Sequence, residues 1–144
     1  MFPAFKSVLV LDKRGATNGE TVTANIDTLG ADFMTLDVHS SSSNNATNNP
    51  STFKLSEGDT TDATAFSDIT AFVGDGTGGW TVPSWHTQTA DAKCVKFDVD
   101  LRHRKRYLKL TITPVTTQDF IAIANLGRNE ATPVSGDQRE LIRG

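Results

Sequence analysis

Three segments in the second half of the chain alternate apolar with polar residues, and they constrain the fold more than any other feature. They cover residues 93–101, 107–113 and 119–125. In the first of them Val95, Phe97 and Val99 occupy every second position, which is the period of a β-strand with one face in a hydrophobic core. The alternation therefore predicts an antiparallel β protein.

Shorter segments earlier in the chain extend this pattern. They are residues 5–12, 21–27, 33–40, 52–56 and 66–73. Polar stretches at 40–50 and 57–64 and a glycine-rich stretch at 74–87 separate them, and no long helical period is present. Such stretches are typical of surface loops. We expect about eight to nine strands joined by long polar loops.

The apolar phase of these segments predicts the core. We expect the following side chains to be buried: Leu9, Leu11, Ile26, Leu36, Val38, Phe97, Val99, Leu108, Leu110, Ile112 and Ile121. Cys94 is the only cysteine, so one chain cannot form an internal disulfide. Its place in an alternating segment predicts a buried thiol rather than a reactive one.

Length and composition fit a single all-β domain. A chain of 144 residues is long enough to bury ~70% of the surface that it exposes when unfolded. The hydrophobic fraction of 37% is low, which is typical of a thin sandwich with large polar loops. We expect a β-sandwich over residues 1–126 and an irregular tail over residues 127–144.

The charge and the N-terminal segment bear on partners and location. A net charge of −3 argues against nucleic acid as a partner of the whole surface, because a phosphate-binding domain is clearly basic. The first twelve residues have no basic stretch before their apolar residues and are too short to span a bilayer. We expect a protein made and assembled in the cytoplasm, with no membrane partner.

Several local features resemble chemical sites without meeting their requirements. The glycines at 74–79 are followed by Trp-Thr-Val-Pro rather than by a helix with a Lys-Ser/Thr pair. The acidic stretch 57–62 lacks the spacing of a calcium loop, and His39, His86 and His103 are not at metal-ligand spacing. We therefore expect no catalytic site, no metal and no cofactor.

A basic segment lies between two of the strongest strand patterns. It contains Arg102, Arg104, Lys105 and Arg106. Three interpretations are open: a soluble turn whose charges protect a sheet edge, a contact patch for an acidic protein surface, or a nucleic-acid contact.

Four stretches of the chain are similar to a group of small structural proteins of tailed bacteriophages. They are residues 8–14, 21–34, 54–59 and 97–114. The resemblance implies a virion component, and its first interpretation is a capsid decoration (cement) protein with a β-sandwich or jelly-roll fold that binds the major capsid protein. It supplies no catalytic residue. The alternative is another phage head or tail component, or a carbohydrate-binding sandwich directed at the host surface.

The two functions use different contact residues. For a decoration protein, Phe2 and Phe5 would anchor the partner, and Arg102, Arg104, Lys105 and Arg106 would steer it. For carbohydrate binding, Trp80 and Trp85 in the glycine-rich stretch would form a stacking platform. Binding to a symmetric lattice favours a closed homo-oligomer, for which we expect a trimer on the capsid surface.

Overall fold

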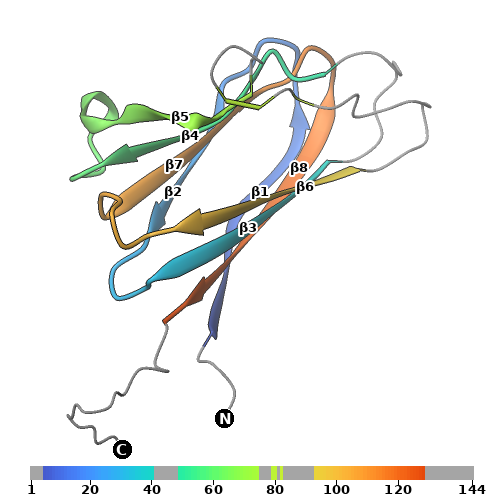
Figure 1. The fold of residues 1–144 in the computed structure, drawn as a ribbon. Coiled ribbons are helices and arrows are strands. Elements are labelled where there is room, and N and C mark those ends of the chain that lie inside the picture. Colours follow the sequence, from blue (N-terminus) through green and yellow to red (C-terminus); the bar gives the residue numbers. More distant parts are fainter. Residues whose placement is uncertain (1–4, 41–48, 75–78, 81, 83–92, 129–144) are drawn as a thin grey trace, which may run out of the picture.

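The fold is all-β, as the alternation predicts (Figure 1). A computed structural model describes residues 5–40, 49–74, 79–80, 82 and 93–128. The strands are β1 (Phe5–Ala16), β2 (Val22–Asp27), β3 (Phe33–Ser40), β4 (Thr52–Gly58), β5 (Ser67–Val73), β6 (Lys93–Asp100), β7 (Tyr107–Thr113) and β8 (Gln118–Gly127). A short 3₁₀ helix, η1, spans Ala63–Ala65 between β4 and β5.

The strands form two antiparallel four-stranded sheets that pack as a sandwich (Figure 1). Sheet A has the order β1-β8-β3-β6 and sheet B has the order β2-β7-β4-β5. Strands pair from the two ends of the chain inward, β1 with β8, β2 with β7, β3 with β6 and β4 with β5. The pairs β3–β8 and β4–β7 fold this long hairpin over on itself, so that its strands divide between the two sheets. This is the topology of a jelly roll.

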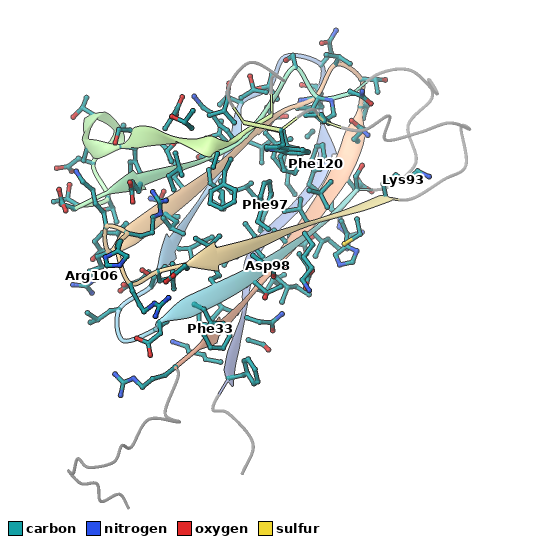
Figure 2. All side chains as sticks on the ribbon, in the orientation of Figure 1. Phe33, Lys93, Phe97, Asp98, Arg106 and Phe120 are labelled. Atoms are coloured by element: carbon teal, nitrogen blue, oxygen red, sulfur yellow. The ribbon has the colours of Figure 1, made fainter. Side chains whose placement is uncertain are left out.

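The core lies between the inner faces of the two sheets, and most of the predicted core residues occupy it. The predicted side chains that are buried are Ile26, Leu36, Val38, Phe97, Val99, Leu108, Leu110 and Ile112, with Leu11 partly buried against them. Phe97 points into the space between the sheets (Figure 2). Alternation predicts these strands well because each has one apolar face and one polar face.

The prediction for Leu9 is wrong, because β1 contains a bulge. Val8 is opposite Ala124 and Leu9 is opposite Ile123, but Leu11 is already opposite Ala122. Val10 is therefore an extra residue, which shifts the phase of the strand. Val8, Val10 and Leu11 pack against the core, whereas Leu9 points outward and is 61% exposed.

The predictions for Ile121 and Cys94 are also wrong. In β8 the buried phase is Phe120, Ala122, Ala124 and Leu126, and Ile121 is half-buried on the outer face. Over residues 120–124 both phases of β8 are apolar, so alternation alone could not choose between them. Cys94 is exposed, because the inward phase of β6 belongs to Phe97 and Val99.

The described part of the chain passes slightly beyond the predicted sandwich boundary. Strand β8 ends at Gly127, and the Arg128 side chain donates a hydrogen bond from Nε to the Gly30 carbonyl at 3.1 Å. Most of the predicted tail lies outside the described residues, so the division at residue 126 stays a prediction.

Candidate partner-binding surface

The outer face of sheet A carries aromatic residues at the end of the sandwich where β1 begins and β8 ends. Phe5 and Phe33 are both opposite Gly127, one from each neighbouring strand. Their ring centroids are 5.8 Å apart in an edge-on arrangement. A Cβ atom built on Gly127 would lie 2.2 Å from Cζ of Phe33. Only glycine therefore lets the Phe33 ring lie against β8.

The same face continues with polar and then apolar side chains. The Ser7 hydroxyl donates to Oδ1 of Asn125 at 2.6 Å. One step further along the strands, Leu9 stands beside Ile123. Phe5 is 58% exposed and Leu9 is 61% exposed. We call Phe5, Leu9, Phe33, Ile121 and Ile123 the apolar outer face.

The outer face of sheet B has a different character. The Lys54 ammonium pairs with Asp68 at 2.8 Å, and the Ser56 hydroxyl donates to the same carboxylate at 2.8 Å. The Lys109 ammonium lies 4.3 Å from the centroid of the Phe66 ring. The charged groups of this face therefore interact with one another. Of the two sheets, sheet A offers apolar area to a partner.

The four cations of the basic segment pair with carboxylates of this chain. The pairs are Arg102 with Asp100 at 2.5 Å, Arg104 with Glu57 at 3.3 Å, Lys105 with Asp59 at 2.9 Å and Arg106 with Asp27 at 2.8 Å. The hairpin between β6 and β7 therefore presents alternating charges rather than a purely positive patch. Exposed pairs of this kind contribute little to stability.

Two of these carboxylates are held in the ionised form. The Arg106 guanidinium, together with the Leu29 amide, lowers the pKa of Asp27 from 3.8 to about 2. The Arg102 side chain and amide hold the pKa of Asp100 well below its ordinary value. The cations respond in the opposite direction: hydrogen bonds to Asp27 and Asp59 raise the pKa values of Arg106 and Lys105.

The basic hairpin and the aromatic pair meet at the same end of the molecule. A cavity of about 370 Å³ is lined by both Phe33 and Arg102. A second cavity, of about 280 Å³, is lined by Phe5, Leu29 and Asp27, and Asp27 is the partner of Arg106. The exposed Leu29 side chain adds apolar surface there. The fold thus joins two groups of predicted contact residues that are far apart in the sequence.

The remaining predicted contact residues fall elsewhere. Trp80 is half-buried and packs edge-on against Phe53 and Phe97, with ring centroids 5.4 Å apart in each case. Its ring therefore belongs to the packing between the sheets. Phe2 and Trp85 lie outside the described residues, so their roles stay predictions.

Sequence reasoning did not single out Phe33, Leu9, Ile123 or Leu29 as partner-contact residues. Phe33 carries one available signal, because it begins a strand in the phase opposite to Met34, Leu36 and Val38. Its approach to Phe5 depends on β8 lying between β1 and β3, which no local pattern reveals.

Within the described residues, no group of three or more His, Cys, Asp or Glu side chains could hold a metal ion. Sγ of Cys94 lies 3.9 Å from Nε2 of His39 on the outer face of sheet A. Partial burial, with a smaller contribution from Asp37, raises the pKa of this thiol, the opposite of what an activated nucleophile needs.

Among the described residues, no helix has the length and apolar character that a membrane-spanning segment requires.

Comparison with known proteins gives a structural likeness but no sequence match. No protein-family model matches the chain, and no curated protein matches it in sequence. The crystal structure of BuGH86wt in complex with neoagarooctaose is similar at a TM-score of 0.41 and 10% sequence identity. The similarity covers 85% of this chain and 19% of that one, so the chain spans about a fifth of that protein's length. A similarity of this size says nothing about a shared activity.

Proposed function

We propose that this chain is a non-enzymatic structural protein of a bacteriophage virion, a capsid decoration protein that binds the major capsid protein. The observation that carries the proposal is the apolar outer face of sheet A, where Phe5 is 58% and Leu9 is 61% exposed. Exposed apolar side chains gathered on one sheet face, here Phe5 and Leu9 on either side of the polar Ser7–Asn125 pair, mark an interaction site. The resemblance of the sequence to tailed-phage structural proteins supplies the kind of partner.

In this proposal the aromatic residues and the basic hairpin have different roles in binding. Phe5 and Phe33 provide rigid aromatic area, which dominates the energy of protein interfaces. The hairpin of residues 102–106 borders this area through the cavities that Arg102 and Asp27 line. Because its cations already have partners in the chain, it acts as a polar rim that orients the capsid surface and adds little affinity.

The test measures occupancy on purified particles that lack the native protein. A Phe5→Ser/Leu9→Ser variant changes exposed side chains and should fold, and we expect it to lose most of its occupancy. The matched control is Thr23→Ser/Asn25→Ser, which changes exposed residues of β2 in sheet B, and it should bind as the native protein does. Equal occupancy of both variants would show that the apolar outer face is not the contact.

Electron microscopy of the same particles locates the protein. Density on the head surface that disappears when the gene is deleted is the expected result. Density confined to the tail would replace the decoration role with that of another virion component.

A further inference from the structure

Strand β6 forms one edge of sheet A, and its main chain is regular over its whole length. Lys93–Asp100 pair with β3 without a register shift. The Leu101 amide donates to the Asp32 carbonyl at 2.9 Å, so the Leu101 amide points toward β3. Because bonded and non-bonded pairs alternate, the main-chain groups of every second residue from Cys94 to Asp100 face away from β3. No other described strand pairs with β6, so these groups form a row of donors and acceptors at the edge of sheet A.

The opposite edge of sheet A is protected. Strand β1 has register shifts between Leu9 and Leu11 and between Lys13 and Ala16, and such bulges discourage pairing with another strand. Strand β6 contains neither a register shift against β3 nor a proline. Of the two edges of sheet A, β6 is therefore the one that can accept a further strand.

The side chains beside this edge carry opposite charges two residues apart. The side chains of Lys96 and Asp98 are 57% and 72% exposed, and their charged atoms approach each other to only 3.8 Å within the chain. Asp98 also accepts a hydrogen bond from the Thr35 hydroxyl at 2.9 Å. The Lys96 and Asp98 charges are thus accessible from the edge.

The order of these charges makes β6 complementary to a second copy of itself. In an antiparallel pair with a twofold axis at Phe97, Lys96 of each copy is opposite Asp98 of the other. An axis at residue 96 would oppose two lysines and an axis at residue 98 would oppose two aspartates, which is unfavourable. An axis between two residues would place the main-chain groups that face away from β3 in one copy opposite groups that face β3 in the other, so the two strands could not form hydrogen bonds. Charge and hydrogen bonding therefore select the same register.

We propose that two copies of this chain pair antiparallel through β6, with the twofold axis at Phe97, and so join their A sheets into one continuous sheet. The interface is isologous, because the same strand serves both copies. The proposal rests on the main-chain geometry and the charges of β6 and is independent of the proposed virion role.

A cavity beside the edge supports the same partner. It measures about 250 Å³, opens between β5 and β6, and is lined by Phe72, Trp80, Val95 and Phe97 among others. The axis at Phe97 brings the β6 strand of the second copy alongside this apolar lining. Pairing would therefore cover apolar surface as well as main-chain groups.

The first experiment measures mass by sedimentation equilibrium in solution, without particles. We expect a dimer for the native chain, and a rise of about tenfold or more in the dissociation constant for Lys96→Asp, which opposes like charges twice. The charge swap Lys96→Asp/Asp98→Lys should recover the dimer. The control Lys6→Asp makes the same change of charge on β1 and should leave the dimer intact. A native monomer or trimer, or a swap as weak as the single variant, would overturn the proposal.

The second experiment tests the register with a disulfide. The proposed axis places Cys94 opposite position 100 of the other copy, at a spacing that suits a disulfide. Within one chain the two positions are ~20 Å apart along the strand, so no internal bond can form. Oxidised Asp100→Cys should therefore give a dimer in which peptide mapping joins Cys94 to the new thiol. Asp98→Cys is the control and should give no such bond to Cys94. If circular dichroism shows that both variants are folded, a disulfide between Cys94 and position 98 in place of one between Cys94 and position 100 would overturn the register.

Discussion

At the scale of single residues, Gly127 shows how one missing side chain shapes the candidate surface. A Cβ atom there would meet three ring atoms of Phe33 at 2.2–2.8 Å. We expect Gly127→Ala to lower the free energy of unfolding by ~1 kcal/mol or less, measured by urea denaturation, because the half-buried Phe33 ring must turn away from β8. Adding Phe33→Ala to this variant should recover part of the loss because the opposing ring is gone. A Gly127→Ala chain as stable as the native one would mean that Phe33 does not lie against β8.

The Asp27–Arg106 pair gives a second prediction at this scale. The pKa of Asp27 is lowered from 3.8 to about 2 by the guanidinium. A carboxyl group whose pKa is lower in the folded than in the unfolded chain stabilises the folded state at every pH above the unfolded pKa. This contribution is lost as the pH falls from about 4 towards 2. We expect an NMR titration to give a pKa of about 2 for Asp27 and a higher pKa in Arg106→Gln, still below 3.8 because the Leu29 amide continues to donate to the carboxylate. The control Lys105→Gln should leave it unchanged. A native value near 3.8 would show that the pair does not form in solution.

At the scale of elements, the sequence predicts a strand well when its two phases differ in polarity. Strand β2 buries Val22, Ala24 and Ile26 and exposes the residues between them, so its face follows from alternation. Strand β1 does not behave in this way, because the extra residue Val10 changes phase within an apolar run. A bulge depends on the partner strand as well as on local sequence. Its position therefore could not be read from the chain alone.

Truncating one leucine on β1 and one on β7 tests which face of each strand is buried. Leu110 is fully buried and Leu9 is 61% exposed. We expect Leu110→Ala to lower the free energy of unfolding by ~2–5 kcal/mol, whereas Leu9→Ala should change it by less than ~0.5 kcal/mol. Chemical denaturation of both variants under one set of conditions makes the comparison. Similar losses in the two would mean that the bulge assigned to β1 is misplaced.

At the scale of the whole molecule, the rolled topology explains why only part of the candidate site could be predicted. Phe5 and the cations at 102–106 were recognisable as unusual residues, because an aromatic near a chain end and a basic turn are visible in the sequence. Their neighbours were not. Arg106 meets Asp27 from β2, and Arg104 meets Glu57 from β4. These contacts exist because β7 lies between β2 and β4.

The position of β8 leads to a prediction for truncated chains. This strand lies between β1 and β3 in sheet A, and it supplies the buried residues Phe120, Ala122, Ala124 and Leu126. A chain that ends at Arg128 keeps the eight strands found among the described residues and should show the native circular dichroism and a cooperative unfolding transition. A chain that ends at Thr117 should remain unfolded, because β1 has lost its partner and two edges of the core are open. Failure of the longer chain to fold would contradict the division at residue 126, and folding of the shorter one would contradict the central place of β8.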